Sequence, residues 1–193
     1  MIGDVFLKTV SHFFPKLTKW LSQVYDPRNK NKITYKPSHL LWLGIFLFLL
    51  RLGSRREITY GLATEEFLKN LCTLTGSYNE KTAHHDTVEY FLERMEPEEL
   101  YSVRHDMATR LIRMKALDRF RLLGKYFMVA IDGTGLVAYK KRHCPHCLTM
   151  KKEGKTIYYH NVLEAKLVTE NGLCLSIETE FIENSDGITK QDL

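Results

Sequence analysis

The stretch YFMVAIDGTG, residues 126–135, indicates which fold this chain adopts. It opens with an almost continuous apolar run, which is typical of a strand buried on both faces of a sheet. Asp132 ends that run, and Gly133 and Gly135 allow the chain to turn sharply behind it. The sequence therefore predicts a buried strand over 126–131 that holds one carboxylate at the edge of a core. The alternative for the same residues is a plain Asp-Gly turn.

The residues after Leu123 predict further strands, because their hydrophobic pattern has a period of two. Asn171-Gly172 is a strong hairpin signal that joins a strand over Ile157–Thr169 to the last strand. With 126–131 and a short strand over Leu136–Tyr139, the pattern predicts an antiparallel meander. In the last strand, the apolar face carries Leu173, Leu175, Ile177, Thr179 and Phe181, and the polar face carries Cys174, Ser176, Glu178 and Glu180.

The residues before Leu123 predict helices. An amphipathic pattern covers Val5 to Val24, and the run LLWLGIFLFLL over 40–50 predicts a buried core helix. We expect Ser38 to be the N-cap of that helix and Gly53 to end it. The run is much shorter than the roughly 20 residues that cross a bilayer, so we expect no membrane partner.

Three more helix starts follow in this half of the chain. Ser54 and Glu57 have the spacing of a capping box. Asp86 is expected to cap a further helix, and Pro97 suits the first turn of a helix that runs to about Leu117.

His84 and His85 precede Asp86, so the three form a candidate set of metal ligands by residue type. We disfavour a metal there, because adjacent residues at a helix start are expected to point apart and Asp86 already serves as a cap.

The chain is therefore expected to be an α/β protein in two parts. Residues 1–122 form a helical N-terminal region, and 123–193 form the start of a sheet domain. With 193 residues, of which 44% are hydrophobic, the chain is large enough to bury a core.

The net charge of +5, from 28 basic and 23 acidic residues, permits a polyanionic partner. Solvated helix faces and contacts with nucleic-acid phosphates are both consistent with the basic clusters. The candidate DNA-binding residues are Arg55, Arg56, Arg110, Arg113, Lys115, Arg119, Arg121 and Lys125.

The four cysteines do not have the pattern of a secreted disulfide framework, and no signal peptide opens the chain. We therefore expect a reducing, cytoplasmic location.

Several segments together resemble the catalytic domain of DDE insertion-sequence transposases of the IS4-like kind. They are LDRFRLLGKYFMVAIDGTG, HCPHCLTM, YYHNVLEAKLV and TEFIEN, and the matching stretch runs from about Leu117 to Gln191. LGSRREI and HHDTVEYFLERMEPEEL are also similar to the helical N-terminal region of this family.

The resemblance implies an RNase H-like fold in which the first strand carries the first catalytic aspartate, here Asp132. It further implies two divalent ions, Mg²⁺ or Mn²⁺, held with a second Asp and a Glu from later elements. Such a pair of metals supports hydrolysis at a transposon end and attack of the freed 3′-hydroxyl on target DNA. DNA, at transposon ends and target, is the implied partner, and a homo-oligomer is a further one.

The second Asp and the Glu of the family are not found before Leu193, so we expect a truncated transposase that is inactive alone. Glu178, Glu180, Glu183 and Asp186 are candidate substitutes, but plain solvated carboxylates and a turn at Asp186-Gly187 are the simpler interpretation. The alternative function is a DNA-binding or oligomerising remnant without catalysis.

Cys144 and Cys147 form a Cys-x-x-Cys pair, which can bind one metal ion. His143, His146 or His160 could complete a tetrahedral zinc site. A metal-free loop that packs or contacts DNA is an equal alternative, and a redox pair is a weaker one because no strand-to-helix setting surrounds it.

Overall fold

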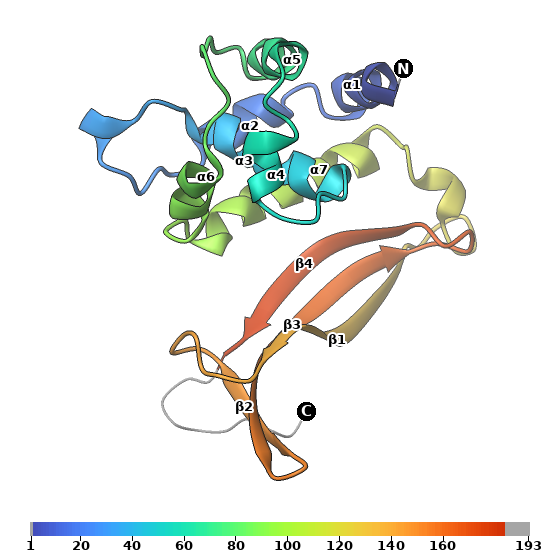
Figure 1. Ribbon diagram of the computed structural model, residues 1–193. Helices are drawn as coiled ribbons and strands as arrows, with labels where there is room; N and C mark the ends of the chain where they lie inside the picture. The colour runs from blue at the N-terminus through green and yellow to red at the C-terminus, as the bar shows by residue number, and fades with distance from the viewer. Residues whose placement is uncertain (1, 184–193) are drawn as a thin grey trace. The chain divides into compact units, whose positions relative to one another are not determined.

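The computed structural model describes residues 2–183. The chain divides into two compact units, one ending at Arg110 and the other beginning at Leu111, earlier than the boundary expected at residue 122 (Figure 1). The first unit is helical and the second contains an antiparallel sheet, so the expected mixture of helices and strands is confirmed. The candidate carboxylate Asp186 and the turn predicted at Asp186-Gly187 lie outside the described residues.

The helices of the chain are short. The α-helices are α1 (Ile2–Phe13), α2 (Leu17–Gln23), α3 (Pro37–Leu49), α4 (Arg56–Tyr60), α5 (Glu65–Thr75), α6 (His85–Leu92) and α7 (Tyr101–Arg113). Single 3₁₀ turns are η1 (Lys30–Lys32), η2 (Pro97–Leu100) and η3 (Asp118–Phe120). Among the described residues, none of these helices has the length and apolar character needed to span a membrane.

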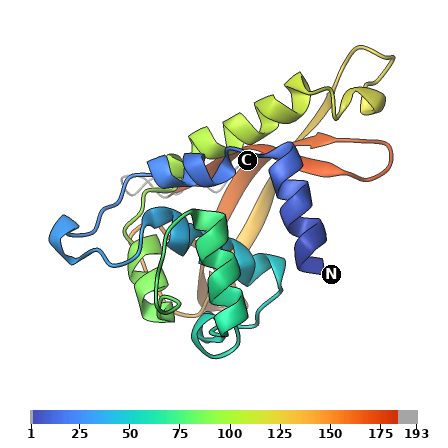
Figure 2. The same cartoon turned by 90° about the horizontal axis from the view of Figure 1, so that it is seen from above.

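Helix α3 is the centre of the first unit, because α2, α4, α5 and α6 all contact it (Figures 1 and 2). Its residues 38–43 are buried, with Leu40, Trp42 and Leu43 at 0% exposure. The Trp42 ring packs against the Phe46 ring at a tilt of 31°, and its Nε1 donates a hydrogen bond to Thr18 Oγ1 at 3.1 Å. The prediction of a core helix is thus confirmed for residues 38–43. The prediction fails at the C-terminal end, where the side chain of Phe48 is exposed.

The predicted caps of α3 and α4 are wrong. Lys36 is the N-cap of α3 and Pro37 occupies its first turn, so that Ser38 is buried inside the helix. The proline is favoured there because its missing N–H would have no partner in a first turn. The helix ends at Leu49, before Gly53. Ser54 forms no capping box, because the short α4 starts after Arg55 and no side chain caps it.

The second unit is a four-stranded antiparallel sheet made of β1 (Met128–Tyr139), β2 (Leu148–Lys152), β3 (Lys155–Val168) and β4 (Cys174–Ile182). The long β3 pairs with β1 along one edge. Along its other edge it pairs with β2 near its start and with β4 further on. The predicted hairpin at Asn171-Gly172 is confirmed, and Gly172 has the positive φ of 80° that its turn requires.

Strand β2 was not predicted from the sequence. Its hairpin with β3 turns at Glu153-Gly154, where both residues have positive φ, 52° and 73°. That pair of conformations is typical of a type I′ turn, which matches the twist of two antiparallel strands.

The prediction for 126–139 is wrong in two respects. One continuous strand, β1, replaces the two strands that were expected around Asp132, and the irregularity in its pairing lies between Gly135 and Val137. The strand is also exposed along its whole length instead of being buried on both faces. The glycines fit within an extended strand, so the Asp-Gly sequence makes no turn here.

The buried core of the second unit is small. Among its described residues, the buried apolar side chains are Leu117, Cys147, Leu148, Val162 and Leu167. Two of these are adjacent, since Cys147 is the last residue of the loop before β2 and Leu148 is the first residue of β2. The end of the Cys-x-x-Cys loop therefore contributes to the small buried core of this unit.

Candidate functional site

Asp132 lies in the middle of β1 and its side chain is exposed to solvent. Its partner across the strands is Glu164 of β3, directly opposite in the register. Residues paired in this way in an antiparallel sheet place their side chains on the same face, about 5 Å apart at Cβ. Lys166 Nζ lies 3.3 Å from Glu164 Oε2 and compensates part of this negative charge. Glu164 is a second carboxylate beside Asp132 that the sequence pattern did not indicate.

The acidic residues of β4 do not join this pair. The register places Thr179, and not Glu178 or Glu180, opposite Glu164. Glu180 is exposed and faces away from Asp132, and Glu183 lies next to a histidine of another loop. The sheet geometry therefore does not place these carboxylates beside Asp132 as candidate substitutes for a second catalytic acid.

Three of the predicted DNA-binding residues take part in local contacts. Arg55 forms an ion pair with Glu89. Arg110 donates to the backbone oxygen of Phe13 at the end of α1. Arg121 pairs with Asp118 at 3.0 Å. These contacts give each arginine a structural role without any nucleic acid.

The other predicted basic residues have exposed side chains and are available to a polyanion. They are Arg56, Arg113, Lys115, Arg119 and Lys125. Arg119 and Lys125 also lie over the rings of their neighbours Phe120 and Tyr126.

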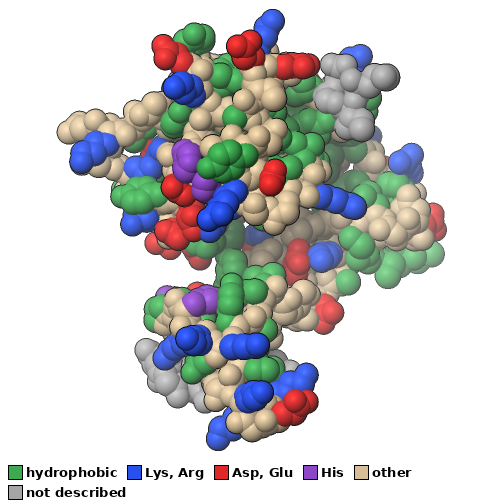
Figure 3. All heavy atoms as spheres, in the orientation of Figure 1, with side chains coloured by type: hydrophobic (Ala, Val, Ile, Leu, Met, Phe, Trp, Pro, Cys, Tyr) green, Lys and Arg blue, Asp and Glu red, His purple; other side chains and the backbone are tan. Residues whose placement is uncertain are grey.

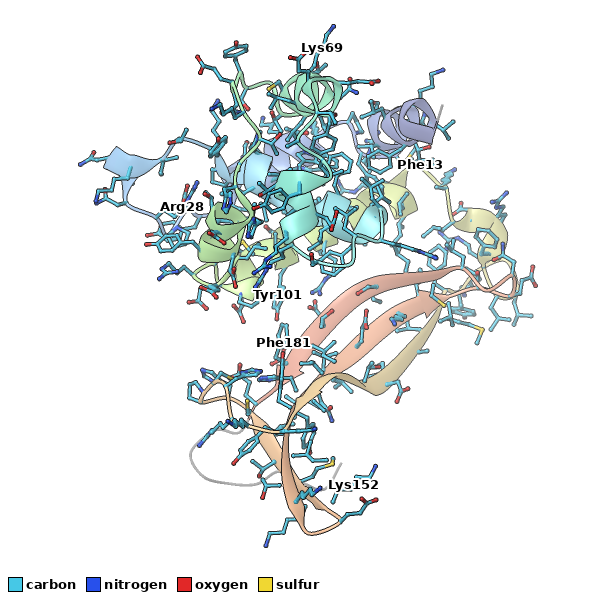
Figure 4. The ribbon with its side chains drawn as sticks, in the orientation of Figure 1. Phe13, Arg28, Lys69, Tyr101, Lys152 and Phe181 are labelled. Carbon is cyan, nitrogen blue, oxygen red and sulfur yellow. The ribbon has the colours of Figure 1, made fainter. Side chains whose placement is uncertain are left out.

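A further basic group, missed in the sequence, surrounds the tip of the β2–β3 hairpin. Lys151, Lys152 and Lys155 are exposed at this tip, with Glu153 between them. Figure 3 shows Lys and Arg side chains gathered there, and Figure 4 labels Lys152 at the end of the hairpin. The sequence analysis missed this group because β2 was not predicted, so nothing indicated that these lysines gather at the tip of a hairpin.

The strongest chemical grouping of the second unit lies at the base of this hairpin. Cys144 and Cys147 in the loop before β2 meet His143 of the same loop and His160 of β3, and one ligand atom of each lies within 4.8 Å of the others. Cys144 Sγ is 3.3 Å from Cys147 Sγ and 3.3 Å from His160 Nε2. Cys147 Sγ is 3.5 Å from His160 Nε2 and 3.7 Å from His143 Nδ1. These four residues are called the Cys/His cluster below.

Strand pairing brings His160 to the loop. His160 pairs with Val137 of β1, and its neighbour Tyr159 pairs with Leu148, the first residue of β2. The loop itself is held by Arg142, whose guanidinium donates to the backbone oxygens of Cys144 at 3.2 Å and Pro145 at 2.8 Å. The rings of His143 and His160 stack with centroids 5.1 Å apart.

His146, another predicted ligand, points away from the cluster. Its Nδ1 lies 2.9 Å from Glu183 Oε2, and both side chains are about half exposed. The sequence could not choose between His143 and His146, because each directly precedes one of the two cysteines. The fold makes the choice by directing only His143 toward Cys147.

The two thiols differ in their electrostatic environment. Burial, followed by the neighbouring Cys147 side chain, raises the pKa of the Cys144 thiol. Burial also acts to raise the pKa of Cys147, but backbone hydrogen bonds, the Cys144 side chain and the Arg142 charge together lower it below its ordinary value. Burial, then the nearby charge of His143, lowers the pKa of His160. Cys147 is therefore the more acidic of the two thiols, and the neutral form of the His160 imidazole, which is its metal-binding form, is favoured.

A second group of candidate ligands, His84, His85 and Asp86, also meets within 4.8 Å. The expectation that these residues point apart is therefore wrong, and His84, not Asp86, caps α6 by accepting a hydrogen bond from the Asp86 backbone N–H at 3.3 Å. His85 Nδ1 lies 2.9 Å from Thr59 Oγ1. Capping and this contact account for the positions of both rings, so a metal is not needed to explain them.

Comparisons with known proteins give no match to a family model, to a curated protein or to a solved structure.

Proposed function

We propose that this chain contributes to a DDE transposase, as the helical region and the first strands of its RNase H-like catalytic domain. The observation that carries the proposal is the position of Asp132, exposed on the first strand of an antiparallel sheet. The resemblance in sequence assigns the first catalytic carboxylate to this residue. The complete enzyme would cut transposon ends and join them to target DNA with Mg²⁺ or Mn²⁺.

The local charge pattern supports a divalent ion at Asp132. Asp132 and Glu164 place like charges directly opposite each other, which destabilises a sheet unless a cation intervenes. Lys166 supplies one positive charge to Glu164. Mg²⁺ typically binds one or two carboxylates, and phosphate oxygens of a nucleic acid fill other positions. Asp132 is exposed and Glu164 is partly buried, so the solvent-facing side of the pair leaves room for such a substrate.

Exposed basic residues support DNA as the partner. Arg113, Lys115 and Arg119 lie near the start of the second unit, and Lys152 lies at its hairpin tip. Contacts of this kind bind phosphates without reading sequence, and they make binding strongly dependent on salt.

The experiment compares metal and DNA binding by the full chain and its variants. Mn²⁺ binding is measured by electron paramagnetic resonance, with and without a duplex that carries one end of the element that encodes the chain. Asp132→Asn is expected to weaken Mn²⁺ binding by about tenfold or more. Glu180→Gln is the matched control, because it removes an exposed carboxylate of the same sheet that does not face Asp132.

Two results are distinguishable. If Asp132→Asn binds Mn²⁺ as tightly as Glu180→Gln does, Asp132 is not a metal ligand and the catalytic proposal fails. If the duplex is then still bound and its affinity falls steeply with salt, the DNA-binding remnant is the better description. The exposure of Arg56, Arg113, Lys115, Arg119 and Lys125 is the observation that supports this second function.

A further inference from the structure

We propose that His143, Cys144, Cys147 and His160 bind one zinc ion in a tetrahedral structural site that fixes the loop before β2 to the central strand β3. The proposal does not depend on the transposase assignment, since it uses neither Asp132 nor the basic residues.

The distances within the cluster fit tetrahedral zinc. With Zn–S of about 2.3 Å and Zn–N of about 2.0–2.1 Å, the ligand atoms of a tetrahedral site lie roughly 3.3–3.8 Å from one another. The S–S distance in the cluster is 3.3 Å, and the S–N distances are 3.3, 3.5 and 3.7 Å. These four distances lie in the tetrahedral range, and the other two, from the His143 ligand atom to those of Cys144 and His160, are within 4.8 Å.

The donor types favour zinc over other ions. Two cysteine thiols and two imidazoles form the Cys₂His₂ set that structural zinc sites use, while Mg²⁺ and Ca²⁺ prefer oxygen ligands. The two cysteines would coordinate the ion from the loop before β2, and His160 would coordinate it from β3. The metal would therefore link this loop to the central strand.

The surroundings suit a closed structural site. Cys147 is fully buried, and Cys144 and His160 are partly buried. With four protein ligands no position remains for water, which distinguishes a structural zinc from a catalytic one. Arg142 fixes the loop by donating to the Cys144 and Pro145 carbonyl oxygens.

A metal link would add stability to a unit that has a small buried core. Its buried apolar side chains, among the described residues, are few, and β2 has only five residues. A short two-stranded hairpin is marginally stable in water without further packing. Small cores are commonly supplemented by a structural metal. Zinc at the base of the β2–β3 hairpin would hold the basic tip, with Lys151 and Lys152, in a fixed position relative to the sheet.

The test uses the full chain purified under reducing conditions, with zinc alone as the probe. Metal content is measured by inductively coupled plasma mass spectrometry, and affinity by competition with a chromogenic chelator. One zinc per chain is expected. His143→Ala and Cys147→Ser are each expected to weaken zinc binding by roughly 100-fold or more. His146→Ala, in the same loop but directed to Glu183, is the matched control and is expected to change affinity less than twofold.

Cobalt gives an independent readout that needs no variant. Co²⁺ added to the metal-free chain is expected to produce the intense visible absorption of a tetrahedral ion, with thiolate-to-cobalt charge transfer, and zinc should abolish both. A weak octahedral spectrum, or a wild-type chain without stoichiometric zinc, overturns the proposal. It is equally overturned if His146→Ala loses as much affinity as His143→Ala, or if the chain purified under reducing conditions still holds Cys144 and Cys147 as a disulfide.

Discussion

Acid is expected to destabilise the first unit through one buried histidine, His39 in α3. The side chain of His39 is completely buried, and its Nδ1 lies 3.2 Å from Asn79 Nδ2, which donates a hydrogen bond to it. The Tyr35 ring packs 5.2 Å away, and His39 Nε2 has no hydrogen-bond partner among the described residues. Burial therefore lowers the pKa of His39 to about 4 from its ordinary value of 6.5.

The sign and size of the effect follow from this difference. Well above pH 6.5 His39 is neutral in both the folded and the unfolded chain, so it contributes no pH dependence there. Between pH 6.5 and about 4, only the unfolded chain binds the proton, and the stability falls as the pH falls. At about 1.4 kcal/mol per pH unit, lowering the pH from 7 to 5 removes about 2 kcal/mol.

Tryptophan fluorescence reports this unit selectively, because both tryptophans of the chain, Trp20 and Trp42, belong to it. We expect the free energy of urea unfolding to be about 2 kcal/mol lower at pH 5 than at pH 7. His39→Gln removes the titrating group and is expected to remove most of that difference, whatever its stability at pH 7.

Asp26 does not contribute to the stability change between pH 7 and pH 5. Burial acts to raise the pKa of Asp26, but Arg28 lowers it below its ordinary value of 3.8, so its contribution is lost only at lower pH. An equal pH dependence in wild type and His39→Gln would refute the reasoning, since the loss would then come from other groups.

The remaining predictions concern packing and capping in the first unit, both measured by urea unfolding at pH 7 with the same fluorescence. Phe91→Ala is expected to lower the free energy of unfolding by about 3–5 kcal/mol, because the ring is completely buried in the core. The ring centroid also lies 5.1 Å from the Arg28 guanidinium carbon. A loss below about 1 kcal/mol would contradict this expectation, since neighbouring side chains would then have filled the cavity. Thr64→Ala is expected to cost about 1 kcal/mol, because Thr64 Oγ1 caps α5 by accepting from the Phe67 N–H at 3.2 Å. Thr64→Ser keeps the hydroxyl and should retain most of the stability, and an equal loss in both variants would contradict the capping role.

Local sequence signals determined where most elements lie. The core helix over 40–50, the turn at Asn171-Gly172 and the helical start at Pro97 were predicted because each depends on neighbouring residues. The helix predicted from Pro97 to about Leu117 is instead a 3₁₀ turn followed by α7, which ends at Arg113. Apolar runs form elements that bury them, glycine permits positive φ, and proline suits a first turn. The N-cap of the core helix was predicted at Ser38, but it is Lys36. Pro37 lies between the two residues and occupies the first turn, which places the cap before it.

Burial and long-range pairing were decided only by the tertiary structure. The apolar run before Asp132 predicted a buried strand, yet β1 is exposed, because burial depends on what packs against a strand and not on its own composition. Register likewise placed Glu164 opposite Asp132, although the two residues are distant in the sequence.

The sequence by itself determined that two cysteines and several histidines lie near one loop, because the Cys-x-x-Cys spacing is local. It did not determine which histidines complete the group. The fold selects His160, which strand pairing carries beside the loop, and His143, and it turns His146 toward Glu183. A metal site needs donors at fixed distances in three dimensions, and only the pairing of β3 with its neighbours sets those distances.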